Sequence, residues 1–554
     1  MDLYPLKAQY LCKEEVILRG ELGAERFDSA QLRIFSLDMM IRRKDLIDKK
    51  RPYISGTIDI EAGSFEAGFA GYGVELVLYA GGKETLLETS FDVVSDHRQS
   101  LRYGFVSDFG AGDKENNAME QLRKYHINMV QFYDWSYRHD CLVSPESAYR
   151  DMMGKLIETD TVREKIKKAS QYGMKSIAYG AVYAASKAFY EAHKSWAFFN
   201  SNQEPFRFID IFYIMNIQEG SPWRKHLMEQ YKNAMLIMGF SGIHMDTYGF
   251  PKTAFSHLKA RPELVELDRE FAGLIDEVRA GLQEEGIDPY LVFNNVGNWP
   301  VSKTAGSTTD AVYIEVWQPY ERYFHIKQLI EDAKVLCENT KPVILAAYLE
   351  PFRKEECKKA AYAAYLLTAA IVSNGAYHLL LGENQGVLTQ GYYGDYSVMD
   401  QETASVMRRY YDFMIRYMEL FYDPALQDVT MTHIGWDNYE YQCGIQNWSA
   451  WGESGKVWIT LRENQSYKCL YLINLCGNSE DHWNKGKDAP AAQYNIEFTV
   501  HIDQDIQGVY CASPDRDRGG SEALAFEYVK NEKGKFVKFC VPELLIWTLV
   551  YIKL

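Results

Sequence analysis

The chain lacks the features that would mark it as exported, disulfide-linked or membrane-bound. Its nine cysteines are scattered from Cys12 to Cys540 without a CxxC pair, so their spacing predicts no disulfide framework. The first residues show no basic segment followed by an apolar one, which a secretory signal would need. The longest apolar stretch, residues 360–372, contains Tyr and Thr and is too short to cross a bilayer. We therefore expect a cytoplasmic protein without a membrane partner, although an exported protein whose leader is missing from this sequence would look the same.

Motifs for several kinds of chemistry are also missing. The sequence has no HExxH, no cysteine cluster, no glycine-rich nucleotide loop and no Gly-x-Ser-x-Gly elbow, so it predicts no cofactor, no metal and no nucleophilic serine. His244 with Asp246, and His139 with Asp140, leave a metal ion as an alternative, because histidine and carboxylate side chains are metal ligands. Twelve histidines in 554 residues also produce such pairs by chance.

Basic residues are fewer than acidic ones. The 60 Lys and Arg residues face 76 Asp and Glu residues, which gives a formal net charge of −16 at pH 7. This balance disfavours a nucleic-acid partner, because binding one requires clustered basic side chains. The abundant residues are tyrosine and tryptophan, with 40 and 11 copies. Their apolar faces and polar edges suit stacking on sugar rings, although core packing explains any single one equally well.

A length of 554 residues is too great for one ordinary core and predicts several domains. Short β-rich runs at 15–20, 32–37 and 73–79, separated by glycine-containing turns, predict an N-terminal Ig-like β-sandwich over residues 1–98. Strand-like runs return near the C-terminus, at 435–436, 456–461, 468–475, 494–501 and 544–554. They predict a C-terminal Greek-key β-sandwich over residues 428–554.

Residues 99–427 alternate short apolar runs with longer amphipathic segments, the pattern of βα units. The apolar runs are 128–135, 175–183, 208–216, 241–246, 290–295, 311–317, 342–349 and 376–382. Helices are predicted at 262–285, 320–339, 353–374 and 400–422. Eight such pairs predict a multidomain protein with a central (β/α)8 TIM barrel between two β-sandwiches. The parallel strands of such a barrel all end at one rim.

Polar and aromatic side chains follow nearly every predicted strand. A barrel rim that binds a polar ligand needs such groups, whereas the opposite end of the barrel does not. The candidates for substrate binding are Tyr133, Asp134, Trp135, Arg138, His139, Tyr183, His244, Asn294, Asn295, Trp299, Trp317, Tyr348 and Glu350. Asp134 and His244 are expected to hold hydroxyl groups, and the tryptophans and Tyr183 to offer stacking faces.

Two acids, Asp246 and Glu315, each follow an apolar run and have glycine, tyrosine or tryptophan beside them. Cleavage of a glycosidic bond needs one acid to protonate the leaving oxygen and one carboxylate beside the anomeric carbon. Asp246 lies on a glycine-bounded turn, which suits a fixed nucleophile, and the apolar neighbours of Glu315 favour its protonated form. An acid at a strand end is also common as a cap or salt-bridge partner, so the pattern alone leaves that alternative open.

Four segments carry a resemblance to a known family: RYGFVSDF (102–109), QFYDWSYRHD (131–140), GIHMDTYG (242–249) and YIEVW (313–317). They resemble glycoside hydrolase family 66, the endo-dextranases and cycloisomaltooligosaccharide glucanotransferases, and the similarity covers nearly the whole chain. The resemblance implies a retaining double displacement on α-1,6-linked glucan in dextran or isomaltooligosaccharides. Within it, Asp246 would be the nucleophile, Glu315 the acid/base, and Asp134 a residue that holds sugar hydroxyls at the cleaved unit.

Two features depart from that family. Its glucanotransferases carry a carbohydrate-binding module inserted in the barrel region, for which this chain has no room, and this favours hydrolysis over cyclisation. Its dextranases are typically exported, so a chain without a visible signal is expected to act on short imported isomaltooligosaccharides. Two alternatives remain, a transglycosylase that forms (cyclo)isomaltooligosaccharides and a catalytically silent carbohydrate-binding protein. The sequence predicts no particular oligomeric state.

Overall fold

The computed structural model describes residues 1–49, 52–516 and 519–554. At its centre, one curled sheet contains eight parallel strand positions. In pairing order they are β9 (Tyr103–Val106), β10 (Met129–Phe132), β13 (Lys175–Ala181), β18 (Gly242–Asp246), β21 (Tyr290–Val296), β22 (Ala311–Glu315), β23 (Val343–Ala346) and the consecutive pieces β24 (Tyr377–Leu379) and β25 (Leu381–Gly382). Because β24 pairs with β23 and β25 pairs with β9, the ladder returns to its first strand and forms a barrel-like core.

Two predicted strand positions are wrong. β9 was not among the predicted strands, and the run 208–216 lies outside the barrel-like core. That run instead forms β16 (Arg207–Phe208) and β17 (Phe212–Ile214), which pair antiparallel in a small separate sheet. A short apolar run does not reveal its pairing partner, which explains why 208–216 was assigned to the barrel. The errors cancel in the count, so Asp246 and Glu315 still end the fourth and sixth strands of the core.

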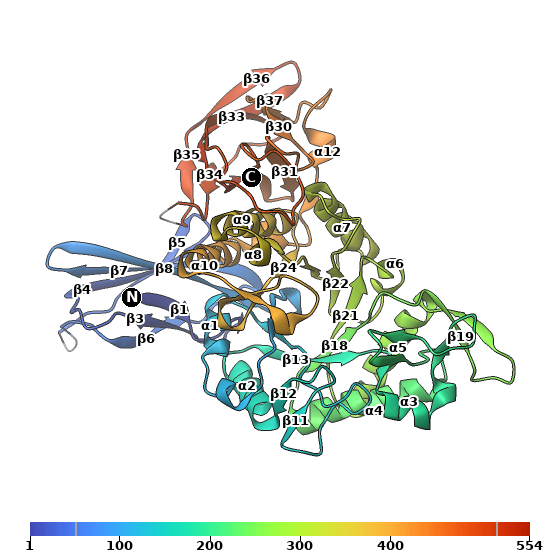
Figure 1. The fold of residues 1–554 in the computed structure, drawn as a ribbon. Coiled ribbons are helices and arrows are strands. Elements are labelled where there is room, and N and C mark those ends of the chain that lie inside the picture. Colours follow the sequence, from blue (N-terminus) through green and yellow to red (C-terminus); the bar gives the residue numbers. More distant parts are fainter. Residues whose placement is uncertain (50–51, 517–518) are drawn as a thin grey trace.

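Helices lie around the central strands, as Figure 1 shows. The longer ones are α1 (Ala118–Lys124), α2 (Thr159–Gln171), α4 (Pro222–Asn233), α5 (Asp268–Glu284), α7 (Tyr323–Leu336), α9 (Cys357–Ser373) and α10 (Gln401–Arg416), and the short α11 (Met418–Tyr422) follows α10. The predicted helix at 262–285 begins late, because its first residues form strand β20 (Glu263–Glu266). Helix α9 is buried on nearly all sides, which explains why it gives the longest apolar stretch of the sequence.

The N-terminal region consists of two sheets (blue in Figure 1). One contains β1 (Asp2–Pro5), β3 (Val16–Glu21) and β6 (Thr57–Gly63), and the other contains β2 (Tyr10–Leu11), β8 (Lys83–Val94), β7 (Phe69–Ala80), β4 (Ser29–Ser36) and β5 (Met39–Asp45). Side chains of both sheets, such as Leu18 and Leu76, belong to one buried cluster. Two sheets facing one core is the arrangement that a β-sandwich requires.

The C-terminal region is built in the same way (red in Figure 1). Its larger sheet contains β28 (Gln427–Asp428), β30 (Trp448–Ser449), β31 (Val457–Glu463), β32 (Tyr467–Asn474), β38 (Trp547–Lys553), β34 (Gly508–Ala512) and β35 (Glu522–Leu524). Its smaller sheet contains β29 (Tyr441–Cys443), β33 (Gln493–Ile502), β37 (Gly534–Leu544) and β36 (Phe526–Asn531). Leu470 and Phe498 join the two sheets in one cluster. The strand predicted at 435–436 is wrong, because Trp436 lies in a turn with a positive φ of 52°.

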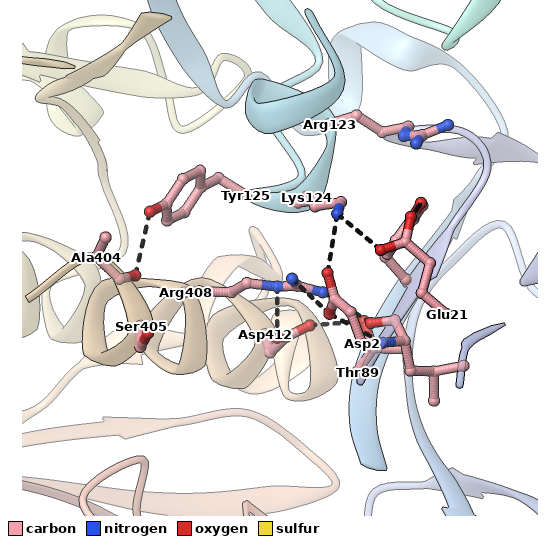
Figure 2. Close-up of polar contacts among 12 residues, drawn as sticks. Asp2, Glu21, Thr89, Arg123, Lys124, Tyr125, Ala404, Ser405, Arg408 and Asp412 are labelled. Atoms are coloured by element: carbon pink, nitrogen blue, oxygen red, sulfur yellow. Dashed lines mark hydrogen bonds and ion pairs between the residues drawn. The ribbon is translucent and has the colours of Figure 1, made fainter. Parts of the chain in front are cut away.

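Ion pairs attach the N-terminal sheets to the barrel helices. Figure 2 shows Asp2 between two cations, with Arg408 of α10 at 2.8 Å and Lys124 of α1 at 2.9 Å. On the same helix, Asp412 accepts hydrogen bonds from the Thr89 hydroxyl at 3.0 Å and from His126 at 2.8 Å. The predicted boundaries after residues 98 and 427 stay predictions; strand β8 ends at Val94 and strand β28 begins at Gln427.

Candidate active site

A cavity of about 430 Å³ opens at the carboxyl ends of the central strands. Both predicted catalytic acids, Asp246 and Glu315, line it. Seven of the predicted substrate-binding residues line it as well, namely Tyr133, Asp134, His139, His244, Asn294, Trp317 and Tyr348. The alternation of side chains along a strand explains the selection, since every second residue points inward. Thus His244 and Asp246 share one face of β18, and Asn294 points inward from β21.

One amide group joins the two acids. Asn294 Nδ2 donates hydrogen bonds to Asp246 Oδ1 at 2.7 Å and to Glu315 Oε2 at 3.0 Å. These two carboxylate oxygens therefore lie no further apart than those distances combined. The parallel register explains the geometry, because Asn294 pairs with Tyr313 on β22, two residues before Glu315. The side-chain oxygen of Asn294, Oδ1, is buried and has no hydrogen-bond partner among the described residues, which leaves it available to a ligand hydroxyl.

Each acid has a tyrosine partner of its own. The Tyr179 hydroxyl donates to Asp246 Oδ2 at 2.7 Å, and the Tyr348 hydroxyl donates to Glu315 Oε1 at 2.7 Å. Burial and the charge of Glu315 raise the pKa of Asp246 to about 7, although the hydrogen bonds from Asn294 and Tyr179 lower it. Burial also raises the pKa of Glu315, opposed by its own hydrogen bonds. Two carboxyl groups this close titrate as a pair, so the pair retains a proton near neutral pH.

Asp134 lies at the end of β10 in a left-handed conformation, with a φ of 49°. Aspartate tolerates this region better than most residues, and the conformation turns its side chain into the cavity that it lines. Burial, together with the charges of Asp151 and Asp246, raises the pKa of Asp134 to about 8. A carboxyl group that is protonated at neutral pH both donates and accepts, which suits the hydroxyl groups of a sugar.

Two histidines of the cavity are neutral. Burial lowers the pKa of His244 to about 3 and that of His139 to about 4. A hydrogen bond of 2.9 Å joins His244 Nδ1 to the Tyr103 hydroxyl, which fixes the ring. In the part of the chain that the structure describes, no three His, Cys, Asp or Glu side chains form a group that could hold a metal ion.

Six predicted substrate-binding residues do not line the cavity. Trp135, Tyr183 and Asn295 are buried in the core. The Trp135 indole donates to the Tyr179 carbonyl at 3.1 Å, the Tyr183 hydroxyl to the Phe250 carbonyl at 2.8 Å, and the Asn295 amide to the Tyr313 carbonyl at 2.8 Å. Asn295 follows Asn294 on β21 and therefore points to the opposite face. These three side chains pack in the core and do not line the cavity.

The other three residues outside the cavity, Arg138, Trp299 and Glu350, contact charged side chains or backbone groups. Arg138 donates to the carbonyl of Arg150 at 2.8 Å, and Glu350 forms an ion pair with Lys354 at 2.5 Å. The Trp299 ring is covered by Lys252, whose Nζ lies 3.4 Å from the ring centroid. A residue that follows a strand by several positions can turn away from the rim, which adjacency in sequence does not reveal.

The aromatic walls of the cavity are mostly residues that the sequence argument missed. They are Tyr179, Phe208, Phe212, Tyr248, Tyr392 and Tyr393. Phe208 stacks on Tyr248 at 4.2 Å between ring centroids, and Tyr133 stacks on Tyr393 at 4.5 Å. Strand alternation would have indicated Tyr179, because it lies inside β13 in register with His244. Tyr248 lies two residues after Asp246, and Phe208 and Phe212 lie in the predicted run 208–216, but none of these was selected as a site residue. Tyr392 and Tyr393 lie beyond the last strand of the core, where no local pattern marks them.

Comparison with known proteins places the chain among glycosidase-type enzymes, the class to which paired carboxyl groups at a barrel rim point. The model of glycosyl hydrolase family 66 matches residues 7–551, so the chain belongs to that family. A cycloisomaltooligosaccharide glucanotransferase from Niallia circulans is 23% identical, with 84% of this chain and 62% of the relative aligned. A dextranase from Streptococcus salivarius is 24% identical, with 82% and 63% aligned. The chain thus spans a little over three fifths of the length of these relatives.

Solved structures show the same fold. A Paenibacillus sp. cycloisomaltooligosaccharide glucanotransferase in complex with cycloisomaltoheptaose superposes with a TM-score of 0.89 at 20% identity, covering 100% of this chain and 99% of the other. An α-amylase from Geobacillus thermoleovorans in complex with acarbose gives a TM-score of 0.52 at 10% identity, covering 83% and 99%. Within residues 1–49, 52–516 and 519–554, no helix has both the length and the apolar character needed to span a membrane.

Proposed function

We propose that the protein is a retaining glycoside hydrolase that cleaves α-1,6-glucosidic linkages in dextran or isomaltooligosaccharides. The hydrogen bonds from one Asn294 amide to both Asp246 and Glu315 support this proposal most directly. They limit the separation of Asp246 Oδ1 and Glu315 Oε2 to the two bond lengths combined, which supports the spacing of retaining enzymes, whose carboxyl groups lie about 5–5.5 Å apart. In inverting enzymes the gap is about 6.5–9.5 Å, because a water molecule must fit between acid and sugar.

In the proposed reaction, Asp246 attacks the anomeric carbon while Glu315 protonates the leaving glycosidic oxygen. The bond between sugar and leaving oxygen breaks as the ester to Asp246 forms. Glu315, now ionised, then removes a proton from water, which attacks the same carbon and releases Asp246. The proton that the pair retains near pH 7 supplies the acid for the first step. Asp134 and His244 hold sugar hydroxyls beside the reacting carbon.

A transglycosylase is the second candidate. Phe208, Phe212 and Tyr248 form one continuous aromatic wall of the cavity, with centroid distances of 4.2 Å and 5.9 Å to Tyr248. Such a wall can hold a second sugar in place of water, so that this sugar receives the glycosyl group. Product analysis at high substrate concentration separates the two, since longer or cyclic sugars indicate transfer and shorter ones indicate hydrolysis.

One incubation tests the main proposal. Dextran and isomaltotriose are each mixed with the enzyme, and proton NMR records the anomeric signals of the fresh products. The proposal predicts that α-anomers appear first and that α-1,6 signals are lost. β-Anomers as the first product would contradict the retaining mechanism, and unchanged α-1,6 signals would contradict the proposed linkage. The Asp246→Ala variant is the control, and it is expected to fold normally and to lose several orders of magnitude in turnover.

We also propose that the paired sheets at either end are β-sandwiches, Ig-like at the N-terminus and Greek-key at the C-terminus. Their two-layer arrangement around one cluster each supports this. The C-terminal β-sandwich would also contact the rim of the barrel-like core, through Trp483 and Asn484.

A further inference from the structure

The loop 480–487, between β32 and β33 of the C-terminal region, contacts two loops of the barrel rim. Its central residue, Trp483, is only 4% exposed and belongs to the hydrophobic cluster of the barrel-like core, not to that of its own sheets. Its indole Nε1 donates to the Tyr320 carbonyl at 2.7 Å, and its backbone N–H donates to the Glu321 carbonyl at 3.0 Å. The loop is therefore inserted into the rim instead of resting on its surface.

Further bonds fix the loop on both sides of Trp483. Asp481 forms an ion pair with Arg322 at 2.7 Å, and its carbonyl accepts from the Tyr323 backbone N–H at 3.0 Å. On the other side, the Asn484 side chain accepts from the backbone N–H of Glu350 at 2.9 Å. These contacts reach the loops that follow β22 and β23. Glu315 is the last residue of β22, and Tyr348 lies two residues after the end of β23.

The residues that Trp483 contacts are close in sequence to Glu315. The Tyr320 N–H donates to the Trp317 carbonyl at 3.0 Å, which closes a turn of four residues that begins two positions after Glu315. The Trp317 indole lies beside the acid, because a methyl group placed on Gly391 would be 3.3 Å from both Glu315 Oε1 and Trp317 Cζ2. Trp317 is also 42% exposed on the cavity wall, which makes it a stacking face for a sugar.

We propose that the 480–487 loop is a positioning element of the active site, with Trp483 as its central residue. By fixing the Trp317–Tyr320 turn, it sets how the Trp317 indole lies against Glu315 and against the glucan. This inference rests on the proposed function for its substrate, an α-glucan, but the placement of the indole beside the acid does not depend on it. The C-terminal region is then part of the active site and not only a neighbouring module.

The simpler alternative is that Trp483 only joins the two regions. The chain offers a matched control for this alternative in Trp547, which is fully buried in the same cluster. Its indole also crosses from the C-terminal region to the barrel helices, where it donates to Ser373 Oγ on α9 at 2.9 Å. Among the described residues, the hydrogen bonds and ring contacts of the Trp547 side chain go to α9, α10 and α11 and not to the loops that follow β22 and β23. Replacing either tryptophan by phenylalanine removes one hydrogen bond between the regions and keeps an aromatic ring.

The experiment compares Trp483→Phe with Trp547→Phe by two measurements, after thermal unfolding has shown that both variants fold. The first is KM and kcat on isomaltooligosaccharides. Trp483→Phe is expected to raise KM by about threefold to tenfold, the value of one misplaced aromatic contact, and Trp547→Phe to leave it unchanged. The second is NMR titration of 13C-labelled glutamate side chains, with the Glu315 signal assigned from Glu315→Gln. Because the Trp317 side chain lies beside Glu315 and favours its ionised form, which lowers its pKa, Trp483→Phe is expected to shift that titration upward.

The outcomes distinguish this inference from the proposed function. If the wild-type enzyme does not act on α-1,6-glucans, the proposed function is wrong, while the titration still tests the positioning role. If Glu315 titrates identically in wild type, Trp483→Phe and Trp547→Phe, the positioning role is wrong even where activity is present. An equal rise of KM in both tryptophan variants would also overturn it, because that is what a purely structural joint predicts.

Discussion

The hydroxyl group of Tyr348 donates a hydrogen bond to Glu315 Oε1 at 2.7 Å. A donor at this position stabilises the ionised carboxylate and so lowers the pKa of Glu315 relative to burial alone. In the proposed reaction Glu315 must be protonated in the first step, and its deprotonation sets the alkaline limb of activity. The sign of the effect follows: weakening this bond keeps Glu315 protonated to higher pH.

The first prediction is that Tyr348→Phe moves the alkaline limb of the kcat/KM profile to higher pH. The phenyl ring keeps the packing against Trp317, with which Tyr348 is in ring contact at 5.6 Å. The acidic limb is expected to move less than the alkaline limb, because the Tyr348 hydroxyl donates to Glu315 and reaches Asp246 only through the charge of Glu315. A full pH profile on isomaltotriose measures both limbs, and a downward shift of the alkaline limb would contradict the sign worked out above.

The second prediction is the counterpart on the other acid. Tyr179 donates to Asp246 Oδ2 at 2.7 Å and lowers the pKa of Asp246, which burial and Glu315 raise to about 7. Asp246 must be ionised to attack, so its protonation sets the acidic limb. Tyr179→Phe is therefore expected to move the acidic limb upward and to narrow the profile, whereas Tyr348→Phe widens it. The pH profile is thus expected to narrow in one variant and to widen in the other. A shift of the same limb in both variants would argue against separate roles for the acids.

The third prediction concerns the amide that joins the acids. Asn294→Ala removes the donor to both carboxyl groups, and we expect kcat/KM to fall by about a hundredfold, the order seen when one preorganised donor is lost. The matched control is Asn295→Ala, whose side chain bonds Thr304 and the Tyr313 carbonyl on the opposite face of the strand. That variant is expected to lose stability but to keep its activity per folded molecule. Equal losses of activity would show that the strand, and not the amide, is what matters.

The fourth prediction concerns stability at the junction of the N-terminal region and the barrel-like core. Arg102 and Asp92 form a two-bond ion pair at 2.9 and 3.0 Å in which both side chains are fully buried. Asp92→Ala leaves a buried guanidinium group without its counter-charge, at a cost of about 3–5 kcal/mol. The control is Asp59→Ala, which breaks the exposed pair with Arg19 at 2.7 Å and is expected to cost under about 1 kcal/mol.

Thermal unfolding measures this difference. Asp92→Ala is expected to unfold at a clearly lower temperature than wild type, and Asp59→Ala within a few degrees of it. A similar unfolding temperature for the two variants would mean that the buried pair contributes no more than a surface pair.

The ends of the central strands could be predicted where a strand is a continuous apolar run. Apolar runs of parallel strands located β18, β21, β22 and β23, and the acids at two of those ends follow directly. β9 was missed although it is as long as β10 and β23, which were predicted, and 208–216 was misplaced because an apolar hairpin resembles a buried strand. The sequence did not show which strand the 208–216 segment pairs with, because strand pairing depends on contacts between residues that are distant in the sequence.

Within the site, the sequence predicted the residues that end strands and missed those that arrive from elsewhere. Asn294 lines the cavity and its neighbour Asn295 does not, a distinction that strand alternation decides once one inward residue is known. Tyr392 and Tyr393 come from a loop after the last strand of the core, and Phe208 from a hairpin after the third. Trp135 was expected to stack on a sugar, yet its side chain is fully buried after the end of β10, where its indole donates to the Tyr179 carbonyl.

The most direct test of the central claim is to trap the covalent intermediate. The enzyme is incubated with a 5-fluoroglucosyl fluoride, which slows hydrolysis of the glycosyl ester, and is then digested and analysed by mass spectrometry. The account predicts one added fluoroglucosyl group on the peptide that contains Asp246, and none in the Asp246→Asn variant. A label on Glu315, on any other residue, or on no residue of an enzyme that consumes the reagent would contradict it.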